Sequence, residues 1–139
     1  MSIHEKIRSQ SSQSVKRDTT QAAPLTLAYI GDTVYDLYVR TFLIDTADAT
    51  PHALHLMSAK YVCAAGQAAA FRRIEPILTE SELAVFKRGR NAHSGTMPKN
   101  ASSADYHTAT GLEALIGYLF LQGEDDRIAQ LLHDAIEGE

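Results

Sequence analysis

The hydrophobic and polar positions divide the chain into a polar beginning and a series of apolar segments with helical spacing. Residues 1–22 are rich in Ser, Gln, Thr, Lys and Arg and contain few residues that form a core. Such a composition is typical of a flexible tail with at most a short, fraying helix. We therefore expect a flexible polar tail over residues 1–22 and a folded domain over residues 23–139.

The segment after Pro24 reads LTLAYIGDTVYDLYVRTFLI and predicts one long helix. At about 100° per residue, an apolar stripe runs along one side and should face the protein's own core. The opposite side is also apolar, which indicates a second packing partner such as another subunit. We expect Tyr29, Val39 and Leu43 near that subunit contact. The core stripe consists of Leu27, Ile30, Val34, Leu37, Tyr38 and Phe42.

A second helix should begin at Thr50-Pro51, because threonine is a good N-cap and proline fits the first helical position. It would continue to Glu75-Pro76, where the proline ends it. Cys63 falls inside this predicted helix and is the chain's single cysteine. A disulfide framework is therefore excluded, and a small buried side chain in a reducing compartment is expected.

Three more helices complete the prediction. Residues 79–82, Thr-Glu-Ser-Glu, form a capping box that opens a helix ending near Asn91. The next helix has Ser103 or Asp105 as its N-cap and is closed by Gly123. The last helix covers residues 124–137, with acidic residues in its first turn. Because no segment alternates as a strand would, the predicted fold is an all-α bundle of about five main helices.

Length and charge limit the classes of protein to consider. The 139 residues fit one domain, and the formal net charge is −4. An acidic chain has no general attraction for nucleic acid or membranes, so a polyanion would need a local basic patch. No apolar run approaches the length of a membrane span, and the first residues lack a signal peptide. We expect a cytoplasmic protein that does not bind membranes.

Three carboxylates lie in apolar surroundings. Asp32 and Asp36 are four residues apart and therefore share one face of the first helix. Glu113, in GLEALIGYLF, has the small residues Ala109 and Gly117 four positions to either side, which allows another helix to approach closely. If the two helices meet there, their carboxylates converge into a cluster that suits Mg²⁺.

A simpler interpretation exists for each of these acids. Carboxylates at the edge of an amphipathic helix are more often solvated or paired with a cation than bound to a metal. Arg40 lies four residues after Asp36 and is the obvious partner for it.

A basic segment, KRGRNAHSGTMPKN, covers residues 87–100 of this acidic chain. Arginine and lysine bind phosphate oxygens, and neutral polar side chains add hydrogen-bond donors. The alternative is that the cations only complement a helix C-terminus, which explains one or two charges but not the long Gly/Ser loop that follows. The candidate polyanion contacts are Lys87, Arg88, Arg90, Asn91, Ser94, Thr96 and Lys99.

These motifs resemble those of the ribonuclease III family. LAYIGDTVYDLYVR resembles the family's signature, in which an acid follows Leu/Ile-Gly on a helix, and GLEALIGYLFL resembles its second acidic motif. KRGRNAHSGTMPKN is similar to the basic loop of one branch, the Mini-ribonucleases III. The three motifs occur in the family's order and at its separations, so the resemblance is specific, and it extends over residues 25 to about 137.

The resemblance implies a helical endonuclease domain that forms a homodimer and cleaves double-stranded RNA with Mg²⁺, for which Mn²⁺ can substitute. Asp32 then matches the catalytic aspartate and Glu113 the metal-binding glutamate. The substrate implied is large-subunit (23S) precursor rRNA, with a pre-ribosomal particle or a ribosomal protein as a further partner. Asp36 matches a variable position and stays a candidate for an indirect role only.

The chain also departs from the longer enzymes of the family. Their additional acids correspond here to Leu25, Ala28 and Thr110, which leaves the number of metal ions open. No segment remains for a C-terminal double-stranded-RNA-binding domain, so we expect the catalytic dimer itself to hold the duplex. Two alternatives stay open: a non-catalytic RNA-binding or ribosome-associated module, and a helical protein-interaction domain, although the latter leaves the basic segment unexplained.

Overall fold

The computed structural model describes residues 3–10, 19–92 and 102–138, and over these residues the fold is all-α, as predicted. Among them are seven α-helices, two short 3₁₀ segments and a final π-helical turn at His133–Glu137, without a strand. The helices are α1 Ile3–Ser9, α2 Pro24–Thr46, α3 Pro51–Val62, α4 Ala64–Ile74, α5 Glu80–Asn91, α6 Ser103–Leu121 and α7 Asp125–Leu132.

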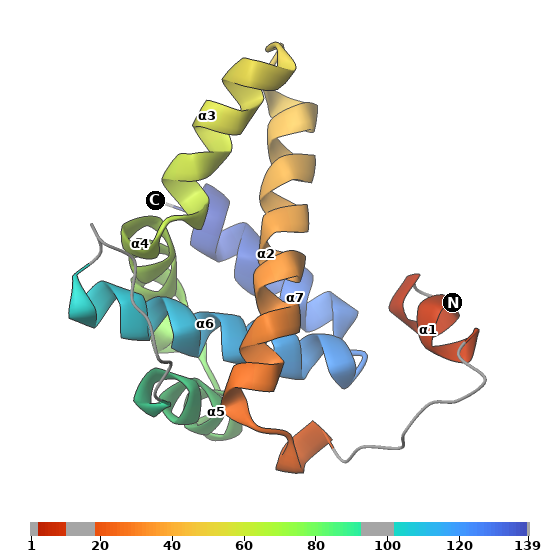
Figure 1. Ribbon diagram of the computed structural model, residues 1–139, viewed down its shortest axis with the longest axis vertical. Helices are drawn as coiled ribbons and strands as arrows, with labels where there is room; N and C mark the ends of the chain where they lie inside the picture. Colours follow the sequence, from red (N-terminus) through yellow and green to blue (C-terminus); the bar gives the residue numbers. More distant parts are fainter. Residues whose placement is uncertain (1–2, 11–18, 93–101, 139) are drawn as a thin grey trace.

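Helix α6 forms the centre of the bundle. It crosses the lower half of α2, with α5 beneath it, while α2 and α3 extend away from the crossing as two arms (Figure 1). The side chains of Leu112, Leu115 and Ile116 on α6 are fully buried and join the core cluster that includes residues of α2, α4 and α7. The middle of α6 therefore has little freedom to shift relative to its neighbours.

Helices α2 and α6 cross with their backbones in contact. A Cβ added to Gly31 would overlap the carbonyl oxygen of Glu113, and one added to Gly117 would overlap that of Leu27. The predicted close approach beside Glu113 is thus confirmed at Gly117. Because main chains meet at this crossing, residues 31–32 of α2 are fixed relative to residue 113 of α6.

The predicted division of α2 into a core side and a subunit side is confirmed in part and wrong at three residues. The residues of the predicted core stripe that are buried or packed against the core are Leu27, Val34, Tyr38 and Phe42. Val39 and Leu43, expected near a second subunit, are buried in the core, whereas Leu37 of the predicted core stripe is 59% exposed. Tyr29 is exposed, as expected for a side that faces away from the core. The buried face is the one that carries Ala28 and Gly31, because these small residues let α6 pack against it.

The long helix predicted from Pro51 is interrupted at Cys63. This residue has an extended backbone (φ −68°, ψ 162°), ends α3 and caps α4, and its Sγ accepts a hydrogen bond from the Gly66 amide at 3.4 Å. Cys63 is also exposed rather than buried. A cysteine seldom acts as an N-cap, so the sequence offered no conventional signal for this break.

The other predicted boundaries agree with the structure to within one or two residues. The Thr79–Glu82 capping box is present at the start of α5, and Gly123 after α6 has a positive φ of 76°. The N-cap of α6 is Ser102, one residue before the earlier of the two predicted positions. In the described part of the chain, none of the helices combines the length and the apolar character that crossing a bilayer requires.

Candidate active site

Asp32 and Glu113 come together where α2 crosses α6. Their carboxyl groups lie close enough to share a hydrogen bond when one of them is protonated. Asp32 is exposed and Glu113 half-buried, so the pair has one solvent-facing and one interior member. The predicted convergence of the two acids is therefore present, held by the backbone contact at Gly31 and Gly117.

The pair is electrostatically strained without a cation. Burial raises the pKa of the Glu113 carboxyl to about 8, and the adjacent Asp32 carboxylate contributes in the same direction. Two like charges in a partly dry site are relieved by a proton or by a cation. Oxygen donors of this kind, with room for water and phosphate oxygens beside them, fit Mg²⁺ or Mn²⁺. Among the described residues, no group of three or more His, Cys, Asp or Glu is placed to hold a metal ion, and Asp32 and Glu113 are two carboxylates without a third such residue grouped with them.

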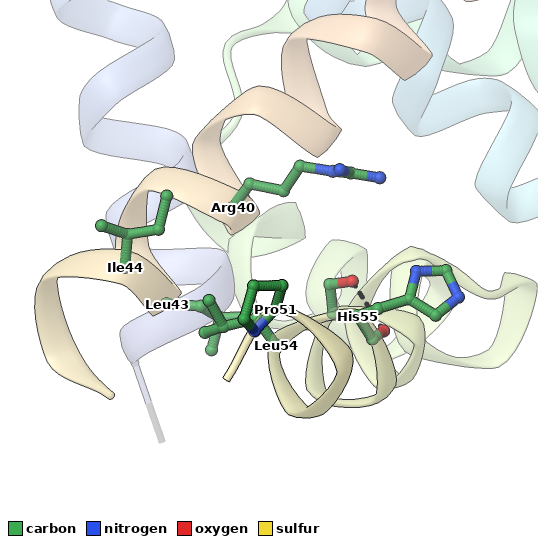
Figure 2. Close-up of a pocket in the computed structure, with 7 residues that line it drawn as sticks. Arg40, Leu43, Ile44, Pro51, Leu54 and His55 are labelled. Atoms are coloured by element: carbon green, nitrogen blue, oxygen red, sulfur yellow. Dashed lines mark hydrogen bonds between the residues drawn. The ribbon is translucent and has the colours of Figure 1, made fainter. Parts of the chain in front are cut away.

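A hollow of about 310 Å³ opens beside Asp32 between α2 and α3. Asp36 and Arg40 also line it, and they form the ion pair that the sequence predicted, with Nε and Oδ2 3.0 Å apart. A second pocket of about 180 Å³ adjoins it and shares Arg40 and His55. Figure 2 shows these two side chains extending to the same side of that pocket, while Leu43, Ile44 and Leu54 lie on the other. The surface beside Asp32 thus carries Arg40 and His55, which the sequence did not predict as phosphate contacts.

Gln67 of α4 is a further polar residue of the site that sequence reasoning missed. Its side chain is 2% exposed, and its Nε2 donates to Glu113 Oε2 at 3.3 Å. Glutamine is a good helix former, and within AAGQAAAF its helix propensity is sufficient to explain its presence. No signal in the sequence therefore marked it as a site residue.

Four of the seven predicted phosphate contacts are among the described residues. Lys87, Arg90 and Asn91 are exposed at the end of α5. Arg90 stacks over the ring of Phe86, with its guanidinium carbon 5.7 Å from the ring centroid. Arg88 is also exposed, yet it donates to the Ala22 carbonyl at 3.1 Å and so holds the segment before α2. Ser94, Thr96 and Lys99 lie outside the described residues.

Helix α6 connects this basic helix end to the acidic pair. A Cβ added to Gly89 of α5 would lie 2.6 Å from the Cβ of Ala114, the residue that follows Glu113. The last turn of α5 is therefore packed against the turn of α6 that carries Glu113, and both groups belong to one rigid part of the bundle.

Comparisons with known proteins identify the family of this chain. The ribonuclease III domain family matches residues 25–124, a range that includes Asp32, Glu113 and the end of α5. The chain belongs to the ribonuclease III family. Within it, the chain is 45% identical to the Mini-ribonuclease 3 of Brevibacillus brevis, over 91% of this chain and 97% of that one. It is 46% identical to the Mini-ribonuclease 3 of Clostridium tetani, over 84% and 78% of the two chains.

The fold has a counterpart among solved structures as well. A crystal structure of a protein from Fusobacterium nucleatum superposes with a TM-score of 0.78, at 26% identity, and the match covers 88% of this chain and 98% of that one. As a ribonuclease III family member of the Mini-ribonuclease 3 type, the protein is an endoribonuclease. The family acts on double-stranded RNA and is typically metal-dependent, which is consistent with the acidic pair.

The raised pKa of Glu113 predicts how the stability of the metal-free protein depends on pH. The folded state holds the Glu113 proton more tightly than the unfolded chain, so this stabilisation is complete below about pH 4.5 and is lost as the pH rises through about 8. We expect Glu113→Gln to be more stable than wild type at pH 8, by roughly 2 kcal/mol after allowance for the partial solvation of the carboxyl group.

Urea unfolding in EDTA at several pH values between 5 and 8 measures this effect. Because the two proteins differ only at residue 113, the difference between their free energies of unfolding isolates that group from the others that titrate in the range. Curves that stay parallel from pH 5 to pH 8 would show that Glu113 titrates normally in the folded protein.

Proposed function

We propose that this protein is a Mg²⁺-dependent endoribonuclease that cuts double-stranded regions of large-subunit (23S) precursor rRNA. The observation that carries the proposal is the Asp32–Glu113 pair, two carboxylates brought together beside an open hollow by two packed helices. An acidic pair that gains a cation is the usual basis of phosphodiester hydrolysis in enzymes that use no covalent intermediate.

Asp32 and Glu113 would hold the cation. When bound, Mg²⁺ supplies positive charge beside the scissile phosphate and an acidified water as nucleophile. Asp32, the exposed member, would meet the RNA, and Glu113, which is half-buried, would hold the cation from the interior side. Mn²⁺, which also prefers oxygen donors, should substitute.

Basic side chains on both sides of the pair would bind the flanking phosphates. Lys87 and Arg90 lie at the end of α5, and Arg40 and His55 line the pockets between α2 and α3. A-form RNA is recognised through phosphates, 2′-hydroxyls and shape, for which such groups suffice. We assign Arg88, Asn91, Ser94, Thr96 and Lys99 to the same contact, Arg88 with one nitrogen already engaged at Ala22.

A second copy of the chain would pack on the outward face of α2. Leu37 and Ile44 are 59% and 66% exposed on this face. Val34 and Leu37 also line a hollow of about 270 Å³ together with Ile128 of α7. Large apolar side chains that lie exposed next to one another are typical of an interface. A two-fold dimer would place one site against each RNA strand and give a staggered double-strand break.

We further propose that the catalytic domain covers residues 23–139, preceded by a polar tail, and that the enzyme acts in the cytoplasm. Its substrate would be the precursor rRNA alone or within a pre-ribosomal particle, where a ribosomal protein assists. The 41–46% identity to Mini-ribonucleases 3 supports the choice of this branch over the longer enzymes.

Cleavage of a precursor 23S rRNA duplex, with each strand labelled in turn, tests the proposal. Wild-type protein should cut both strands with Mg²⁺ or Mn²⁺ and neither strand in EDTA. Binding of the duplex without cleavage under every metal condition would instead identify a non-catalytic RNA-binding module. Absence of both binding and cleavage would favour a protein-interaction domain.

A further inference from the structure

Gln67 is buried at the first turn of α4, and its amide nitrogen makes two hydrogen bonds. Nε2 donates to the Val62 carbonyl at 3.0 Å and to Glu113 Oε2 at 3.3 Å. The first bond reaches the end of α3 and the second reaches α6. One amide group therefore connects three helices at the point where the acidic pair forms.

The orientation of this amide follows from its partners. Both groups that face Nε2, a main-chain carbonyl and a carboxylate, are acceptors, so an amide turned by 180° would place Oε1 against two acceptors. The Val62 carbonyl can only accept, so Nε2 must point toward it. Because Nε2 lies between Val62 and Glu113, this nitrogen also faces Glu113 whether the Glu113 carboxyl group is protonated or ionised.

The break between α3 and α4 allows Gln67 to reach both the Val62 carbonyl and Glu113. Cys63 has an extended backbone, so α4 starts in a new direction instead of continuing α3. A Cβ added to Gly66 would overlap the Lys60 carbonyl oxygen, so the first turn of α4 packs directly on the last turn of α3. In a continuous helix, Gln67 would be five residues beyond Val62 along one axis and its side chain would not turn back to that carbonyl.

We propose that Gln67 is a positioning residue that orients the Glu113 carboxylate for cation binding. This inference rests on the proposed function. By holding Oε2, Gln67 would fix the plane of the Glu113 carboxylate and leave its Oε1 available to the cation. Without Gln67, the cation alone would have to orient this half-buried carboxylate.

The oxygen of the Gln67 amide needs a hydrogen-bond donor. Gln67 Oε1 is buried and has no hydrogen-bond partner among the described residues. Buried acceptors are nearly always satisfied by protein or by ordered water. We therefore assign to Gln67 Oε1 a hydrogen bond from a buried water molecule, a second contact that would hold the amide in its orientation.

The test is Mn²⁺ binding to the RNA-free protein, followed by electron paramagnetic resonance. Gln67→Met keeps the length of the side chain but has neither donor nor acceptor, and we expect 10–100-fold weaker Mn²⁺ binding. In cleavage assays, the Mg²⁺ concentration for half-maximal rate should rise by a similar factor, with most of the rate recovered at saturating Mg²⁺. If Gln67→Met does not fold, Gln67→Asn carries the same test, since its shorter amide cannot reach both partners.

Tyr35→Phe is the matched control. Tyr35 is fully buried, and its Oη donates to the carbonyl of Tyr61, the residue before Val62, at 2.9 Å. The variant removes a buried hydrogen bond to the same helix end and leaves the hydrogen bond between Gln67 and Glu113 in place. It should lose stability comparable to Gln67→Met, by thermal unfolding, and keep wild-type Mn²⁺ affinity.

Each outcome decides between a positioning and a purely structural role. Wild-type Mn²⁺ affinity in Gln67→Met, or equal weakening in Tyr35→Phe, overturns the inference and leaves Gln67 a structural residue. Asp32→Asn serves as a third sample: if it binds Mn²⁺ as tightly as wild type, the acidic pair is not the metal site, and the proposed function fails together with the inference.

Discussion

Asp32→Asn should lower the rate of duplex cleavage by at least about 10³-fold while duplex binding stays close to that of wild type. The substitution keeps the size of the side chain but removes one of the two negative charges of the proposed metal site. Loss of metal-assisted stabilisation costs several kcal/mol in the transition state, and about 4 kcal/mol corresponds to a factor of about 10³.

Asp36→Asn is the matched control for this prediction. Asp36 lies one turn further along α2, lines the same hollow and is paired with Arg40, outside the contact between Asp32 and Glu113. We expect its cleavage rate to remain within a few-fold of wild type, because the substitution leaves both carboxylates of the proposed metal site and the positive charge of Arg40 in place. Equal loss in both variants would mean that the general acidity of this surface, rather than the pair, supports cleavage. Single-turnover rates and filter binding at the same Mg²⁺ concentration provide the two measurements.

Gly31→Ala should destabilise the fold by about 3 kcal/mol or more and abolish cleavage. The added Cβ overlaps the Glu113 carbonyl and approaches the Gly117 amide, both of which are main-chain groups that no side-chain rotation can move away. The helices must separate, with loss of the packing between α2 and α6. Because the same contact sets the position of Glu113 relative to Asp32, any folded fraction should also cleave poorly.

Ala84→Ser also adds a single heavy atom, at an exposed position of α5, and serves as the control. Its free energy of urea-induced unfolding should lie within about 0.5 kcal/mol of wild type. If Gly31→Ala were as stable as this control, the backbone contact between α2 and α6 would not be as close as the structure has it.

The fold class and the convergence of the acidic pair could be predicted because both depend on local signals. The Thr79–Glu82 capping box and the Thr50-Pro51 start are short motifs whose geometry is largely independent of the rest of the chain. The close approach beside Glu113 followed from Gly117 one turn away, where a small residue permits helix contact. The chemical roles of Asp32 and Glu113 came from the family resemblance, and the structure supplies only their proximity.

The sequence assigned Leu37, Val39 and Leu43 to the wrong sides of α2 because apolar character was the only criterion. Val39 and Leu43 share their face with Gly31, which adds nothing to a hydrophobic stripe but allows another helix to pack at short distance. The face with Leu37 has larger side chains and stays exposed. When a helix is apolar on two sides, the small residues decide which side packs more closely.

Gln67 and the break at Cys63 could not have been found by pattern analysis. No proline marks the break, and the cap is a weak thiol acceptor, so the segment has the features of one uninterrupted helix. The role of Gln67 depends on a change of direction between α3 and α4 that only tertiary packing determines. The burial of Gln67 marks it as a candidate site residue. Composition alone does not show that this residue of an alanine-rich helix is buried.

A crystal structure of the protein soaked with Mn²⁺, recorded near the manganese absorption edge, tests the central claim most directly. We predict an anomalous peak in contact with the carboxylates of both Asp32 and Glu113 and facing the hollow between α2 and α3. A peak only at other residues, from crystals of protein that cleaves duplex RNA with the same Mn²⁺, would contradict the account and place the metal site elsewhere.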